Sequence, residues 1–163
     1  MVPMVPDVHH HQPRRSTPIT SLIWGATRSW SAHSWVPHLT KVLMDRGSGL
    51  NILYANTLDK MGIPWSSLRL SWAPFYGIMS GKEAMTLGCI WFNITFGQPD
   101  NFCKELLTFE VVDFPDIYHA LLGRPCFTKF MAIPNYTYLN LKMPILKGVI
   151  TIMGSFEQAY YCE

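Results

Sequence analysis

Hydrophobic and polar positions change their pattern near residue 38 of this 163-residue chain. Residues 1–37 hold a Met-Val-Pro repeat, a run of histidines at 9–11, an Arg pair and scattered Ser, Pro and Trp, without a sustained period of 2 or 3.6. Such a composition is typical of a flexible segment. We therefore predict a flexible, poorly ordered arm at residues 1–37 and one folded domain at residues 38–163.

Short apolar runs separated by turn residues fill the predicted domain, and this pattern favours strands over long helices. We expect a buried strand at 39–44 and a hairpin within 72–96 whose strands are joined across a Gly-containing turn. Further strands are expected at 106–112, 120–122, 136–142 and 149–152. Residues 56–61, followed by Gly62 and Pro64, predict a short helix with a glycine stop, and Ser155 is a candidate cap for a terminal helix.

A carboxylate, Asp45, ends the first apolar run and is followed by a turn of small residues that contains Gly47, Ser48 and Gly49. An acid at the mouth of a buried strand lies where desolvation and neighbouring groups change its protonation. The glycines allow a tight turn that brings backbone amides close to the acid. The pattern predicts a candidate catalytic acid, and the alternative is an ordinary loop acid or helix cap.

A second apolar run, residues 120–122, ends on Gly123 and by itself indicates a buried strand followed by a turn. Hydrolysis of a peptide by carboxylates alone needs two of them, one as base and one as acid. Asp113 and Asp116 flank a proline turn without the Gly/Ser pattern, so we interpret them as turn acids. The second acid is therefore expected from a second copy of the chain across a two-fold axis.

An ordered series of segments carries a family resemblance: the Asp45 turn, then residues 50–55, 75–78, 87–90, 120–125 and 148–160. In this order they resemble the retropepsin-like aspartic proteases found in the polyproteins of plant Ty3/gypsy-type retrotransposons. The resemblance implies an all-β fold: a small closed or partly open barrel with one or two short helices, forming one half of a two-fold dimer. It also implies a hairpin flap over the cleft, a peptide or polyprotein substrate and no cofactor.

The resemblance assigns roles to particular positions. The catalytic turn consists of Asp45, Gly47 and Ser48. Substrate-binding positions on the flap are Phe75, Tyr76, Gly77 and Ile78. Structural positions beside the active site are Leu121, Leu122, Gly123 and Arg124, with a short helix beginning at the arginine.

Arg46 departs from the family pattern, which has Thr, Ser or Gly at this position. A guanidinium stays charged and favours the ionised form of a nearby acid, whereas an aspartic dyad needs one shared proton. Its bulk also opposes close backbone approach. We therefore hypothesise that the chain is impaired or inactive as a protease. Three alternatives stay open: an active dimeric endopeptidase, an inactive dimerising or peptide-binding module of the same fold, and an unexpressed or misfolding relic.

Composition excludes some classes of function. The net charge of +2 gives no electrostatic argument for nucleic acid, and no apolar segment approaches the length of a membrane span. The cysteines at 89, 103, 126 and 162 lack the spacing of a metal site, and the histidine run at 9–11 is interpreted as a solvated polar tract. We expect no metal, no membrane, reduced cysteines and a cytoplasmic protein, within a retroelement particle if the resemblance holds.

Overall fold

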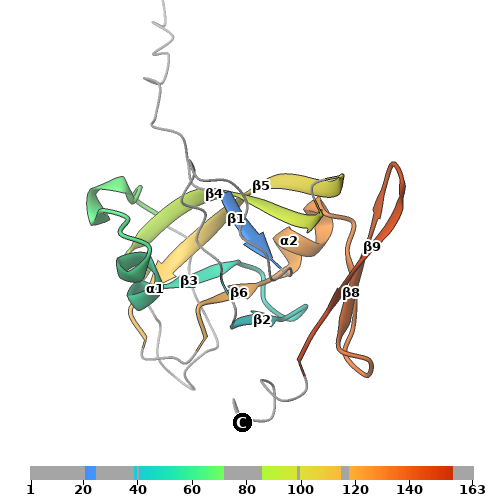
Figure 1. Ribbon diagram of the computed structural model, residues 1–163. Coiled ribbons are helices and arrows are strands. Elements are labelled where there is room, and N and C mark those ends of the chain that lie inside the picture. The colour runs from blue at the N-terminus through green and yellow to red at the C-terminus, as the bar shows by residue number, and fades with distance from the viewer. Residues whose placement is uncertain are drawn as a thin grey trace, which may run out of the picture.

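The structure, a computed structural model, describes residues 21–24 as backbone, and residues 39, 41–71, 86–98, 100–114 and 118–155 in full. Within these residues the chain forms two sheets with two short α-helices and one turn of 3-10 helix. Figure 1 shows how these elements are arranged. This arrangement confirms the all-β class. No helix of the described part is long and apolar enough to span a membrane.

The larger sheet has six strands in the spatial order β1-β4-β5-β3-β6-β2. Their bounds are β1 Ser21–Trp24, β2 Val42–Met44, β3 Ile52–Tyr54, β4 Gly88–Gln98, β5 Asn101–Val112 and β6 Ala120–Leu122. The smaller sheet, which we call the C-terminal meander, has the order β7-β8-β9, with β7 Ile133–Asn135, β8 Asn140–Ile145 and β9 Gly148–Met153. The helices are α1 Ala55–Lys60, α2 Arg124–Lys129 and the 3-10 turn Trp65–Ser67.

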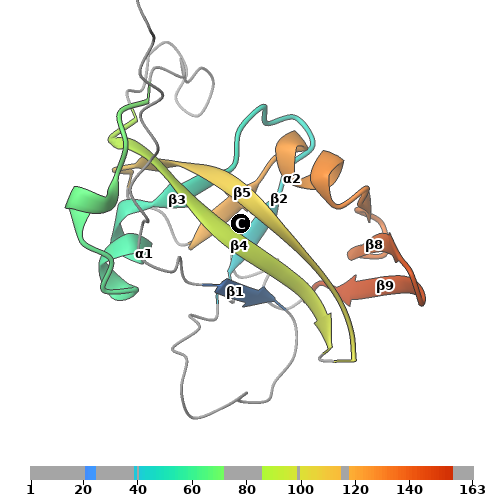
Figure 2. The same ribbon diagram turned by 90° about the horizontal axis from the view of Figure 1, so that it is seen from above.

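The antiparallel pair β4 and β5 forms the longest element of the fold, as Figure 2 shows from above. Along β4 the residues at even positions from 90 to 96 are buried and those between them are only half-buried, the alternation expected of a strand with one face on the core. Phe92 packs against Phe109 of β5 edge to face, with ring centroids 5.8 Å apart. The main hydrophobic core therefore lies on one face of this hairpin.

Helix α2 and the meander close the main core. Phe130, at the end of α2, packs edge to face on Phe96 with ring centroids 4.8 Å apart. The inner face of the meander contributes buried residues to the same cluster, namely Leu141, Met143, Ile150 and Ile152. The meander is thus anchored by apolar burial and is part of the folded unit.

Several predicted elements are confirmed. Helix α1 ends next to Gly62, which has a positive φ of 64°, as the glycine stop requires. The predicted strands at 106–112, 120–122 and 149–152 lie within β5, β6 and β9. Helix α2 begins at Arg124, as the resemblance implies.

Two predicted strands need correction. Residues 136–139 form a turn, so strand β8 begins only at Asn140, although the segment alternates in sequence. The strand expected at 39–44 contains only Val42–Met44, and it is not fully buried because Leu43 is 37% exposed. The physical reason is topological: among the described strands β2 pairs with β6 alone and therefore lies at the edge of the sheet.

Other predicted segments lie partly or wholly outside the residues that the structure describes. Residues 21–24 of the predicted arm form strand β1, parallel to β4, which the missing periodicity did not indicate, while the rest of the arm lies outside the described residues. The predicted hairpin within 72–96 is described only in its second half, where β4 pairs with β5. Its first half, and the terminal helix beyond residue 155, also lie outside them.

Candidate active site

Asp45 directly follows strand β2, and its backbone N–H donates to Leu122 O at the end of β6, at 3.0 Å. Strands β2 and β6 run parallel, with Val42 opposite Ala120. The acid therefore lies where the carboxyl ends of two parallel strands meet. A strand remote in sequence fixes its backbone position.

The carboxylate of Asp45 is held by its own turn. Gly47 N–H donates to Asp45 Oδ1 at 2.7 Å, a charge-assisted hydrogen bond. A Cβ added at Gly47 would lie only 3.0 Å from the same oxygen, so this position favours a glycine. The other carboxylate oxygen, Oδ2, accepts no hydrogen bond from the described residues, and Asp45 is only partly buried. Oδ1 is therefore fixed by the turn, and Oδ2 is available to bind another group.

A polar side chain missing from the predicted site, Asn51, ties the acid turn to the β6 end. Its Oδ1 accepts from Gly123 N–H at 3.0 Å, and its Nδ2 donates to Thr108 O of β5, also at 3.0 Å. Asn51 is 2% exposed. Buried amides need partners, so an asparagine at the start of an apolar run was the signal that could have indicated this role.

Gly123 lies directly against the acid turn. A Cβ at this position would clash with Leu50 O and lie 2.9 Å from Ser48 O. The next amide, Arg124 N–H, donates to Ser48 O at 3.0 Å. The Arg124 side chain also lies over the turn, because a Cβ on Gly49 would be 3.2 Å from its Nη2.

The hydroxyl of Ser48 serves the turn itself. Its Oγ donates to Leu50 O at 2.8 Å and accepts from Leu50 N–H at 3.2 Å. A hydroxyl engaged in both directions by the backbone stabilises the turn, and it is not placed as a nucleophile. Within the predicted catalytic turn, Asp45 is therefore the group available for proton transfer.

Arg46 projects its side chain to solvent, whereas its backbone N–H donates to Tyr136 Oη at 3.2 Å. Tyr136 belongs to the turn between β7 and β8 and was not among the predicted site residues. No local pattern indicates this contact, because the two residues are 90 positions apart in the sequence.

The remaining predicted residues separate into two groups. Leu122 belongs to the main core, while Leu121 packs on the opposite face in a second cluster with Ile52, Tyr54 and Val112. The flap positions Phe75, Tyr76, Gly77 and Ile78 lie outside the described residues.

One further acid is buried near these strands: Glu110 of β5, which is 6% exposed. Its Oε1 accepts from Ser71 Oγ at 2.9 Å, and its Oε2 has no hydrogen-bond partner among the described residues. In the strand order, β3 and β6 lie between β5 and β2. Three strand spacings of about 4.8 Å place the two strands roughly 14 Å apart, too far for Glu110 and Asp45 to share a proton. Asp113 is exposed, and Asp116 lies outside the described residues.

The described cysteines and histidine do not suggest a different reaction centre. Burial raises the pKa of the Cys126 thiol to about 12 and also raises the pKa of Cys103 and Cys89, where Glu105 and Glu110 add to the effect. Burial, followed by Lys60 and Lys41, lowers the pKa of His119. Among the described residues no group of three or more His, Cys, Asp or Glu could hold a metal ion.

Comparison with solved structures finds the crystal structure of the retroviral protease-like domain of Ddi1 from Leishmania major. The two chains are 12% identical, the match covers 69% of this chain and 80% of that chain, and the TM-score is 0.45. Such a likeness carries no argument about family or activity. No protein-family model matches the chain, and no curated protein matches it.

Proposed function

We propose that this chain is one half of an aspartic endopeptidase, in which two copies each contribute Asp45 to a shared dyad. The observation that carries the proposal is the geometry of Asp45. Its carboxylate stands at the end of parallel strands β2 and β6, with Oδ1 held by Gly47 N–H and Oδ2 without a partner in the described part. The second copy is required because Glu110 is too distant and no other described acid adjoins the turn.

The proposed reaction uses no cofactor. In the dimer, one Asp45 carboxylate takes a proton from a water molecule, and the protonated carboxyl of the other copy donates to the carbonyl oxygen of the peptide. The water attacks the carbonyl carbon, and proton return to the leaving amine completes the cleavage. The backbone hydrogen bonds around Asp45 keep the two acids oriented without motion during the reaction.

Arg46 limits this activity in our proposal. Its side chain starts beside Asp45 and is exposed in the single chain, so a two-fold axis at the acid turn would bring two guanidinium groups together. Like charges repel, and a nearby cation opposes the shared proton of the dyad. We expect Arg46→Gly to raise the kcat/KM of peptide cleavage at least about 10-fold, equivalent to about 1.4 kcal/mol of transition-state stabilisation.

The experiment compares the purified chain with Arg46→Gly and Asp45→Asn on a library of peptides at pH 4 to 7. Cleavage that is sensitive to pepstatin, is optimal at acid pH and is lost in Asp45→Asn supports the proposal. Cleavage that survives Asp45→Asn refutes the catalytic assignment. Equal, robust activity in the native chain and in Arg46→Gly refutes only the impairment.

An inactive member of the same fold is the second candidate, and Arg46 is the observation that favours it. Such a module would dimerise or bind peptides without cutting them. Sedimentation and peptide binding, measured on the native chain and on Arg46→Gly, separate the two: binding without cleavage in both proteins favours the module. Aggregation of the expressed chain would favour a relic that no longer folds.

We further propose that the chain derives from a retrotransposon polyprotein of the plant Ty3/gypsy type and acts in the cytoplasm, within a retroelement particle. The ordered series of motifs from the Asp45 turn to residues 148–160 supports this origin. The neighbouring coding DNA tests it. A nucleocapsid-like region upstream and a reverse transcriptase downstream are the expected result, and unrelated neighbours on both sides would contradict it.

A further inference from the structure

Three consecutive backbone amides of the acid turn are bound by three different parts of the molecule. Asp45 N–H donates to Leu122 O of strand β6. Gly47 N–H donates to the carboxylate of Asp45. Between them, Arg46 N–H donates to the hydroxyl of Tyr136, which belongs to the C-terminal meander. The peptide that links Asp45 to Arg46 is therefore fixed on both sides of the acid.

The meander fixes the backbone of the turn that carries Tyr136. Strand β7 pairs with β8 up to the pair Asn135 and Asn140, which closes the turn that carries Tyr136. Within this turn Asn135 Oδ1 accepts from Tyr138 N–H at 3.0 Å. Gly154 N–H donates to Leu139 O at 2.6 Å on the far side of the turn. The buried inner face of the meander fixes this assembly on the main core.

We infer that Tyr136 is a positioning residue for the acid turn, through the hydrogen bond that its hydroxyl accepts from Arg46 N–H. This bond orients the peptide from which the Asp45 and Arg46 side chains diverge. Through this bond the C-terminal meander contributes to the geometry of the candidate active site. The catalytic meaning of this role rests on the proposed function, whereas the anchoring itself concerns the single folded chain.

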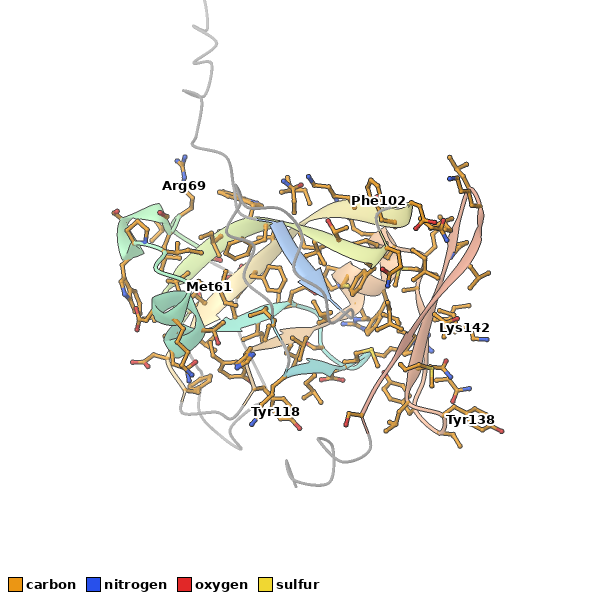
Figure 3. The ribbon with its side chains drawn as sticks, in the orientation of Figure 1. Met61, Arg69, Phe102, Tyr118, Tyr138 and Lys142 are labelled. Atoms are coloured by element: carbon orange, nitrogen blue, oxygen red, sulfur yellow. The ribbon has the colours of Figure 1, made fainter. Side chains whose placement is uncertain are left out.

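The chain offers a matched pair of tyrosines for the test. Tyr136→Phe removes only the hydroxyl that binds Arg46. Tyr138→Phe removes a hydroxyl from the same turn whose oxygen has no hydrogen-bond partner in the described part. Tyr136 is 50% exposed and Tyr138 is 68% exposed, so neither substitution leaves a cavity in the core. Figure 3 shows Tyr138 at the outer end of the meander, pointing away from the larger sheet.

The first measurement is amide hydrogen exchange of the native chain and of both variants by NMR, which requires no cleavage. We expect the Arg46 amide to exchange about 5-fold faster in Tyr136→Phe, the factor that corresponds to one ordinary hydrogen bond, and unchanged in Tyr138→Phe. The urea midpoint of unfolding should fall slightly in Tyr136→Phe, because one hydrogen bond is lost, and stay the same in Tyr138→Phe. An unchanged Arg46 amide in Tyr136→Phe, or an equal change in Tyr138→Phe, overturns the inference.

The second measurement is peptide cleavage in the Arg46→Gly background, which retains the amide that Tyr136 binds. Tyr136→Phe should lower kcat several-fold at constant KM and displace the pH profile, whereas Tyr138→Phe should do neither. A faster Arg46 exchange without cleavage in any variant supports the anchoring and refutes the proposed protease. Cleavage with the same kcat and pH profile in Tyr136→Phe overturns the positioning role and leaves the protease standing.

Discussion

Two buried polar side chains of the larger sheet region, Asn51 and Glu110, differ in how completely they are hydrogen-bonded. Asn51 binds with both ends of its amide, to Gly123 N–H and to Thr108 O. Within the part of the chain that the structure describes, Glu110 is hydrogen-bonded through one carboxylate oxygen, and its Oε2 has no partner. The two residues are close, since Glu110 N–H donates to Asn51 O at 2.9 Å. Burial alone therefore does not tell which polar group supports the fold.

The difference in hydrogen bonding between Asn51 and Glu110 bears on the candidate active site. Asn51 binds Gly123, the neighbour of Leu122, whose carbonyl accepts from Asp45 N–H. The satisfied amide thus belongs to a continuous set of contacts that ends at the acid turn. A fully bonded polar network specifies one geometry, whereas a partly bonded group costs free energy and specifies less. We expect Asn51 to stabilise the site and Glu110 to reduce stability.

Replacement of Asn51 by leucine is the strongest way to break this comparison. Asn51→Leu keeps the approximate volume but leaves Gly123 N–H and Thr108 O without their partners. The Gly123 contact is buried, whereas the Thr108 contact is only partly buried. A buried unsatisfied group costs about 1–3 kcal/mol, so we expect the free energy of unfolding to fall by about 3 kcal/mol. Urea denaturation followed by tryptophan fluorescence measures it.

Asn93→Leu provides the control for this loss. Asn93 lies on β4 of the same sheet, is half-buried and has no side-chain hydrogen bond in the described part. Its replacement should change stability by less than about 0.5 kcal/mol. Equal losses in the two variants would mean that the amide network of Asn51 contributes nothing specific.

The contrast between the two residues also bears on what the sequence could predict. Short apolar runs between turn residues located β5, β6 and β9, and the Gly/Ser turn after an apolar run located Asp45. The pairing of strands depends on residues that are distant in the sequence. For example, β2 lies beside β6 although Val42 and Ala120 are far apart in the chain. Hydrophobic periodicity gives the face of a strand but not its neighbour. The partners of Asn51 and the contact of Tyr136 with Arg46 depend on that pairing and could not be predicted.

The position of β2 at the edge of the sheet explains why the predicted burial of this strand was wrong. The segment 39–44 is predicted to be buried because it ends in the apolar run 42–44, but apolar composition does not distinguish a central strand from an edge strand. Leu43 is exposed because β2 has a neighbour on one side only within the described strands. Glu110 was likewise missed, since a single acid within an apolar strand pattern is normally assigned to a solvated face.

Neutralisation of Glu110 sharpens the comparison from the other side. Glu110→Gln keeps an acceptor for Ser71 Oγ and removes the charge from the unpartnered buried oxygen. Burial of an incompletely bonded charge is unfavourable, so we expect the free energy of unfolding at pH 7 to rise by about 1 kcal/mol. Urea denaturation at constant ionic strength measures the change, and a loss of stability in Glu110→Gln would show that the carboxylate is favourably bound.

The control for this gain is Glu105→Gln on the same strand. Glu105 is only partly buried, so its charge remains hydrated to a large extent. We expect a change of less than about 0.5 kcal/mol in either direction. A gain equal to that of Glu110→Gln would assign the effect to net charge instead of burial.

His119 is an intermediate case, because its hydrogen bond exists in only one protonation state. Lys41 N–H donates to His119 Nδ1 at 3.4 Å, which requires a neutral ring. Burial, then Lys60 and Lys41, lowers the pKa of His119 below its ordinary value of 6.5. The unfolded chain therefore binds this proton at a higher pH than the folded chain does. The contribution of His119 to stability is present above pH 6.5 and is lost as the pH falls below it.

His119→Gln removes this titration and should flatten the pH dependence of stability below pH 6.5. The effect should be the smallest of the three, because His119 is partly exposed and solvent screens the charges of the two lysines. Thermal unfolding between pH 5 and pH 8 measures it, with the native chain as reference. This loss of stability at low pH bears on the proposed protease. If cleavage is optimal at acid pH, the enzyme is active in the pH range in which His119 lowers the stability of the fold. A native chain whose stability rises as the pH falls from 6.5 to 5, relative to His119→Gln, would contradict the lowered pKa.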